Sequence, residues 1–119
     1  MKSHTLTTVS SRPERLKRFA RIVRCVSKVT GVSALDIIQG RPTKEQADAR
    51  MMTWYLIRLE MPEATVREIG HAFGKDHTTI SVAVGKAKTK TISDEEFRVN
   101  LAAARSFYRQ ALDKSQSTT

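Results

Sequence analysis

Residues 65–86, TVREIGHAFGKDHTTISVAVGK, contain two short helical patterns separated by a single glycine-containing turn. Thr65 and Glu68 have the spacing of a capping box at the start of the first pattern, and Gly74 is placed to end it. Asp76 is positioned to cap the second pattern. Two helices joined by so short a turn predict a helix-turn-helix, which we place at residues 65–90.

The second helix, predicted over residues 76–88, has two chemically different faces. One face repeats apolar residues at helical spacing and is expected to pack on the first helix through Ile80, Ala83, Val84 and Ala87. The opposite face is small or polar and has no acidic side chain, so its backbone can approach a DNA groove closely: His77, Thr78, Ser81, Val82 and Gly85. Three lysines suited to phosphate contacts follow, namely Lys86, Lys88 and Lys90.

The remainder of the chain also shows helical periodicity. Apolar residues at three- and four-residue steps predict a helix over residues 13–30, a short one over 33–40 and a longer one over about 45–60. Ser93 and Glu96 form a second capping-box pattern, which predicts the start of a terminal helix there. Alternation typical of strands is absent, so we expect an all-α fold of about six helices around the helix-turn-helix.

The length of 119 residues suits one domain with a single modest core. We predict a flexible, Ser- and Thr-rich tail over residues 1–11, a helical DNA-binding domain over 12–114 and a disordered end over 115–119. The single cysteine, Cys25, lies on the apolar side of its helix and is expected to be a small buried hydrophobic residue.

Charge is unevenly distributed along the chain. Lys and Arg number 21 against 12 Asp and Glu, and residues 1–30 alone hold eight basic side chains and one acid. This balance favours a polyanionic partner, either nucleic acid or an anionic membrane surface. The helix at 13–30 has two interpretations: its arginines attract phosphates, or it is a core helix with a solvated basic face. We favour the core interpretation for its apolar stripe and phosphate attraction for its arginines.

The motifs of several other classes of protein are missing from the sequence. The three histidines and Cys25 have no metal-ligand spacing, and no nucleophile or phosphate-loop motif occurs. No apolar run is long enough for a membrane span or a signal peptide. We therefore expect a protein that is not an enzyme, with no catalytic residues, metal, cofactor or nucleotide, and with no membrane partner.

The quartet Asp-His-Thr-Thr at 76–79, preceded by Ile69-Gly70-x-x-Phe73-Gly74, resembles the signature of the C-terminal DNA-binding domain of the bacterial replication initiator DnaA. The similarity extends from about Val26 to Lys90, and more weakly into the terminal helix. It implies a Trp-repressor-like helical fold that binds a short, asymmetric box in double-stranded DNA. The box is contacted in the major groove by the Asp-His-Thr segment and in the adjacent minor groove by a basic loop.

Carried over residue by residue, the resemblance assigns base contacts to Asp76, His77 and Thr78, and we add Ser81 from the same face. Phosphate contacts fall on Arg50 and Arg58, which we expect to point away from the buried face of their helix. The other assigned or added phosphate contacts are Thr65, Val66, Lys75, Thr79, Lys86 and Lys88. The minor-groove loop corresponds to residues 41–44, with Arg41 and Lys44 as its basic side chains. For Asp76, a helix cap is as strong an interpretation as a base contact.

Some features depart from the family pattern. Pro42 and Glu45 make the loop less basic, the turn before the quartet is one residue shorter, and Asp48 stands where a basic residue is usual. No G-x-x-x-x-G-K-[ST] phosphate loop accompanies the domain. We therefore expect a freestanding transcriptional regulator in the cytoplasm, associated with the nucleoid. Two alternatives stay open: a replication modulator acting at origin boxes, and an adaptor that docks RNA polymerase or a replication protein through the helix at 93–113.

Overall fold

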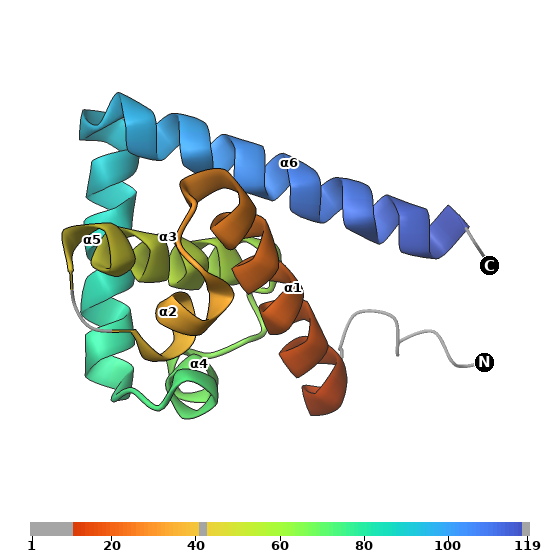
Figure 1. Cartoon of the computed structure of the whole chain (residues 1–119). Helices are drawn as coiled ribbons and strands as arrows, with labels where there is room; N and C mark the ends of the chain where they lie inside the picture. Colours follow the sequence, from red (N-terminus) through yellow and green to blue (C-terminus); the bar gives the residue numbers. More distant parts are fainter. Residues whose placement is uncertain (1–10, 41–42, 118–119) are drawn as a thin grey trace.

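The computed structural model describes residues 11–40 and 43–117, which form six helices and no strand (Figure 1). The predicted all-α fold and its six helices are confirmed. The tail over residues 1–10 and the loop residues Arg41 and Pro42 lie outside the described residues. The helices are α1 (Arg12–Thr30), α2 (Ala34–Gln39), α3 (Lys44–Glu60), α4 (Val66–Phe73), α5 (His77–Ser93) and α6 (Glu95–Ser117).

The helix starts follow from short polar side chains that accept the first backbone N–H groups. Ser11 accepts from the amide of Glu14, whose carboxylate accepts in return from the amide of Ser11, so α1 has a complete capping box. Ser33 and Thr43 are the N-caps of α2 and α3, and their hydroxyls accept from the amides of Asp36 and Gln46. Among the described residues no helix is long and apolar enough to cross a membrane.

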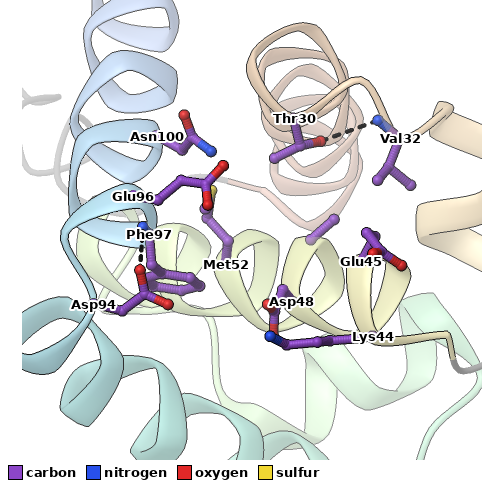
Figure 2. A pocket seen from close by; sticks show the side chains of 11 residues that line it. Thr30, Val32, Lys44, Glu45, Asp48, Met52, Asp94, Glu96, Phe97 and Asn100 are labelled. Carbon is purple, nitrogen blue, oxygen red and sulfur yellow. Dashed lines mark hydrogen bonds between the residues drawn. The ribbon is translucent and has the colours of Figure 1, made fainter.

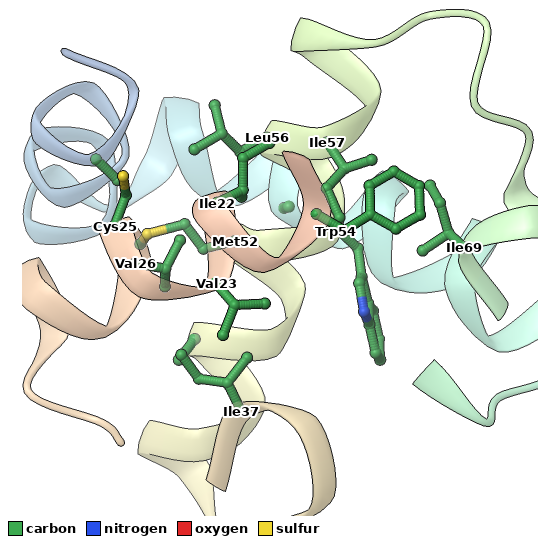
Figure 3. Close-up of a cluster of buried hydrophobic side chains, with 14 of the residues drawn as sticks. Ile22, Val23, Cys25, Val26, Ile37, Met52, Trp54, Leu56, Ile57 and Ile69 are labelled. Carbon is green, nitrogen blue, oxygen red and sulfur yellow. The ribbon is translucent and has the colours of Figure 1, made fainter. Parts of the chain in front are cut away.

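Helix α3 forms the centre of the fold and packs against α1, α2, α5 and α6. Because it has neighbours on several sides, it is buried around much of its circumference, and Met52, Thr53, Leu56 and Ile57 are all buried. Apolar spacing along the helix would also place Tyr55 and Leu59 in the core, but both are only half-buried. Figure 3 shows side chains from α1, α2, α3 and α4 meeting in this core. The buried Cys25 confirms the expected small hydrophobic role, and burial raises the pKa of its thiol.

Arg50 corrects one expectation about α3. It is only 7% exposed, although we predicted that it points away from the buried face. Its guanidinium donates to the carbonyl oxygens of Asp36, at 3.1 Å, and of Gly40, at 3.0 Å. The Asp36 carbonyl also accepts from the Gly40 amide at 2.8 Å, whereas the Gly40 carbonyl lies past the end of α2, where the helix supplies no donor. This charged residue therefore joins α2 to α3.

The turn between α4 and α5 is set by two glycines. Gly74 has a φ of 67°, the left-handed conformation that ends α4, and the next amide, that of Lys75, donates to the carbonyl of Gly70 at 2.8 Å. The carbonyl of Lys75 lies so close over Gly70 that a Cβ there would collide with its oxygen. Gly70 thus lets the turn fold back onto α4, which fixes where α5 begins.

Several predicted boundaries are wrong by a few residues. Helix α5 continues to Ser93, five residues past the predicted end, and Asp94 caps α6 through a 3.1 Å bond from the amide of Phe97. The capping box predicted for Ser93 and Glu96 is therefore replaced, because the Ser93 hydroxyl donates back to the carbonyl of Thr89 within α5. Helix α6 reaches Ser117, so it extends past the boundary that we set at 114.

Candidate nucleic-acid interface

Helix α5 is held on one side and open on the other. Ile80 and Ala87 are fully buried and Ala83 and Val84 are half-buried, which confirms the predicted packing face. The residues predicted to face outward are all exposed, namely His77, Thr78, Ser81, Val82 and Gly85, and so is Thr79. No Asp or Glu occurs anywhere in α5, and its charged residues are lysines. This exposed, acid-free surface, from His77 to Lys88, is suitable for contact with a polyanion.

Asp76 is the N-cap of α5. Its Oδ1 accepts from the amide of Thr78 at 3.0 Å and lies 3.2 Å from Nδ1 of His77. The backbone hydrogen bond from Thr78 is the main reason that the pKa of Asp76 lies below its ordinary value, with the neighbouring His77 adding a smaller effect. The cap interpretation is confirmed, and the base contact stays a prediction. Both of these contacts use the same carboxylate oxygen, while the side chain as a whole is exposed.

A groove separates the exposed side of α5 from α3. It is lined on α3 by Ala47, Arg50, Met51 and Trp54, and on the α5 side by Lys75, Thr79 and Lys86. Four predicted phosphate contacts, Arg50, Lys75, Thr79 and Lys86, therefore line one groove, although Arg50 is mostly buried. Hydroxyl and ammonium donors along one groove are the groups that bind phosphate oxygens in protein–DNA interfaces. Sequence reasoning missed the apolar part of the α3 wall, because only the tertiary packing places Ala47, Met51 and Trp54 beside α5.

The remaining predicted phosphate contacts lie in different settings. Arg58 is half-buried, and its guanidinium donates to the carbonyls of Pro62, at 3.1 Å, and Ala64, so it fastens the loop before α4. Thr65 is exposed at the N-cap of α4, and Val66 follows it. The capping box predicted here is one-sided, because the Glu68 carboxylate pairs with Arg15 at 2.8 Å rather than with the Thr65 amide. The phosphate contacts of Arg50 and Arg58 stay predictions, and both side chains have structural roles.

Lys90 differs from the two lysines before it. Lys86 and Lys88 are exposed, whereas the Lys90 ammonium lies 3.1 Å from Asp94 and 3.5 Å from Asp48. The hydrogen bond to Asp94 is the main cause that raises the pKa of Lys90. Lys90 therefore joins the end of α5 to α3 and α6, which corrects our grouping of it with the phosphate-binding lysines. The acidic Asp48, noted as a departure from the family pattern, has this lysine as its partner.

Lys44 is the first residue of α3 and not part of the preceding loop. It lines a hollow of about 250 Å³ between the end of α1 and the starts of α3 and α6 (Figure 2). Four carboxylates line the same hollow: Glu45, Asp48, Asp94 and Glu96. So many acids repel a phosphate backbone, so this hollow does not extend the surface of α5. The minor-groove contact of Lys44 stays a prediction, and its partner Arg41 lies outside the described residues.

Helix α1 was expected to have an apolar stripe in the core and arginines that attract phosphates. Phe19, Ile22 and Val26 are buried, whereas Leu16, at the start of the expected stripe, is 42% exposed. Two of its arginines have intramolecular partners: Arg15 pairs with Glu68, and Arg18 donates to the Tyr108 hydroxyl of α6 at 2.5 Å. These two side chains therefore connect helices of the fold, and the attraction of phosphates that we expected of the helix's arginines stays a prediction for the others.

A family comparison identifies the motif built by α4 and α5. The model of the bacterial DnaA protein helix-turn-helix matches residues 19–87, more than half of the chain, from within α1 to within α5. The chain belongs to the DnaA helix-turn-helix family. The all-helical fold and the exposed quartet at 76–79 agree with this membership, and the resemblance inferred from the sequence is confirmed. Membership in the DnaA family supports sequence-specific binding of double-stranded DNA.

Individual DnaA proteins are similar over most of the domain. The chromosomal replication initiator protein DnaA of Brucella abortus is 32% identical over 95 residues, which cover 79% of this chain and 19% of the relative. Those of Bartonella quintana and Streptococcus uberis are 33% and 34% identical, over 66% and 64% of this chain and 16% and 17% of the relatives. The chain thus spans about a fifth of the length of the curated relatives that it matches.

Two substitutions separate the cap from the base contact at Asp76. Asp76→Asn keeps a capping oxygen and should retain the thermal midpoint, whereas Asp76→Ala removes the cap and should lower it. Because the pKa of Asp76 is lowered by folding, its stabilisation is complete above the unfolded pKa and is lost as the pH falls through the folded value. The difference between wild type and Asp76→Ala should therefore shrink in strongly acidic buffer, as measured by thermal unfolding monitored by circular dichroism.

The same two variants also test whether Asp76 contacts a DNA base. If Asp76 contacts a base, Asp76→Asn should lose affinity for the preferred duplex relative to a random one. If Asp76 is only a cap, Asp76→Asn should bind every duplex at least as tightly as wild type, because one negative charge facing the polyanion is gone. Fluorescence anisotropy with both duplexes distinguishes the two roles. If Asp76→Asn loses as much affinity for the preferred duplex as Asp76→Ala does, while its stability is unchanged, the cap-only account is contradicted.

Proposed function

We propose that this protein is a sequence-specific double-stranded DNA-binding protein, and a transcriptional regulator, that recognises a box similar to those of DnaA. It acts by binding and not by catalysis. The first turn of α5, with Asp76, His77 and Thr78, enters the major groove and contacts base edges. Thr79, Lys75 and Lys86 contact the phosphates of the adjacent backbone.

One observation supports this proposal most strongly. The quartet at 76–79 is exposed at the beginning of a helix whose opposite side is anchored in the core by Ile80 and Ala87. Side chains that contact bases must be both accessible and rigidly positioned, and the start of α5 meets both requirements. Since a helix N-terminus also directs backbone amides outward, it adds an attraction for the phosphates that flank the base contacts.

A direct test of the proposal is selection from a random duplex pool. The wild-type protein should enrich one short asymmetric sequence at near-physiological salt. The variant in which both His77 and Thr78 are replaced by Ala serves as the matched control, and should enrich the same sequence weakly or not at all. Failure of the wild type to enrich any sequence would overturn the proposal.

A second candidate function is modulation of replication at origin boxes. The relatives that match this chain are named chromosomal replication initiator proteins, which favours a shared or overlapping target sequence. Footprinting across the genome distinguishes the two roles. Regulation of transcription predicts bound sites next to promoters, whereas modulation of replication predicts sites at the origin and competition with the initiator for the same duplex.

Lys86 is expected to contribute to affinity through a phosphate contact. Lys86→Ala should reduce the slope of log K against log salt by about one unit and weaken binding to specific and random duplexes alike. Lys17→Ala, an exposed lysine of α1 outside the groove, is the matched control and should leave the slope unchanged. A titration series over several salt concentrations measures both, and an unaltered slope for Lys86→Ala would remove this residue from the interface.

A further inference from the structure

The glycine at the middle of α5 has no role in the folded chain itself. The other four glycines each have a structural reason: Gly31 and Gly74 have positive φ, and at Gly40 and Gly70 a Cβ would collide with a backbone oxygen. At Gly85 an added Cβ has no heavy atom within 4 Å. Its backbone is helical, eight residues from each end of α5. Nothing in the described structure therefore requires this residue to be glycine.

Glycine is also unfavourable at this position. In a helix interior it is less stable than alanine, because its backbone loses more conformational freedom on folding. The helices surrounding α5 leave the position open, so alanine would fit without displacing a neighbour. The isolated protein would gain stability from the larger residue. The Gly85 carbonyl accepts from the Thr89 hydroxyl at 3.3 Å, a bond that any residue at this position could make. A glycine that weakens its own helix and has open space where a side chain would lie indicates a partner whose surface approaches the backbone there.

We propose that Gly85 is a point of close approach between α5 and the DNA duplex, so that α5 lies along the major groove from its first turn to its middle. This inference rests on the proposed function and extends it. The contact surface then includes Ser81 and Gly85 as well as Thr78. A side chain at Gly85 would hold the helix away from the groove and disturb the base contacts of its first turn.

The positions along α5 agree with such an orientation. Thr78, Ser81 and Gly85 are separated by three and four residues, so they lie on the same face of the helix, and all three are exposed. Seven residues of helix span about 10 Å, which corresponds to about three base pairs of duplex. Val82 and Lys86 border this line on the side of the α3 groove, and no acidic residue interrupts it. The occupant with matching charge and shape is a nucleic-acid groove.

The test measures stability and DNA affinity of Gly85→Ala together. The thermal midpoint should rise by about 4 °C, because helix propensity improves. Affinity for the duplex selected by the wild type should fall by about fivefold or more, because the new methyl group overpacks the contact. Gly85→Leu, with a longer side chain, should lose more affinity while it remains folded. Opposite changes in stability and binding are not produced by a general loss of folding.

Ser106→Ala provides the matched control, since it improves helix propensity at an exposed position of α6. It should raise the midpoint without altering DNA affinity. Unchanged or tighter binding by Gly85→Ala would overturn the close approach while leaving the proposed function intact. A lowered midpoint for Gly85→Ala would also overturn it, because the glycine would then serve the fold. If the wild type prefers no duplex, the proposed function fails and the close approach fails with it.

Discussion

Gly70→Val should lower the free energy of unfolding by about 3 kcal/mol, the largest loss of stability that we expect from one substitution in the helix-turn-helix. A side chain at Gly70 meets the carbonyl oxygen of Lys75, which is backbone and is held in place by the bond from the Lys75 amide to the Gly70 carbonyl. The turn must therefore open before the side chain fits. Urea unfolding followed by circular dichroism measures the loss.

Ala72→Val is the matched control for this prediction, because Ala72 is exposed on the same short helix and the substitution changes helix propensity without a collision. Ala72→Val should lower the free energy of unfolding by less than about 1 kcal/mol. The milder Gly70→Ala should stay folded but displace the start of α5, so its affinity for the preferred duplex should fall more than its affinity for random DNA. A Gly70→Val protein as stable as Ala72→Val would contradict the geometry of the turn.

His77→Ala and Thr78→Ala should each weaken binding to the preferred duplex by about 1–3 kcal/mol, which is a loss of affinity of about fivefold to 150-fold. Both side chains are exposed, so neither substitution removes core packing and the thermal midpoint should change little. Affinity for random duplexes should also change little, because phosphate contacts remain. Gln110→Ala, at an exposed position of α6, is the control and should bind as the wild type does. Equal losses on both duplexes would argue against direct contacts with bases.

The helices were predictable where the sequence signal was local. The apolar periodicity of α1 and α6, the short α2 between Ser33 and Gly40, and the glycines around the helix-turn-helix all depend on residues a few positions apart. The break between α5 and α6 was misplaced because two residues compete there. Ser93 and Asp94 both suit an N-cap, and Asp94 is the residue that also pairs with Lys90, four positions before it. This spacing is visible in the sequence, but we had assigned Lys90 to phosphate binding.

The candidate site was predictable in its first turn and not in its surroundings. The exposure of His77, Thr78 and Ser81 follows from the apolar periodicity of α5 alone. The placement of Arg50 does not, because its partners are carbonyl oxygens of α2 and its C-cap, and the contact of Lys90 with Asp48 of α3 does not either. A basic residue near a binding surface can stabilise the fold or bind a phosphate, and only the tertiary contacts distinguish these roles. The same is true of the α3 side of the groove.

The proposed contact between His77 and a base is tested most directly by a double-mutant cycle. Wild type, His77→Ala and Thr78→Ala are each titrated against the preferred duplex and against duplexes with one base pair changed, beginning with the position that selection identifies as most restricted. If His77 or the neighbouring Thr78 contacts the changed base pair, the change should lower the affinity of the wild type. It should have little effect on the affinity of the variant that lacks the contacting side chain, which gives a coupling energy of about 1–3 kcal/mol. Strictly additive losses for both variants at every position of the duplex would contradict the account.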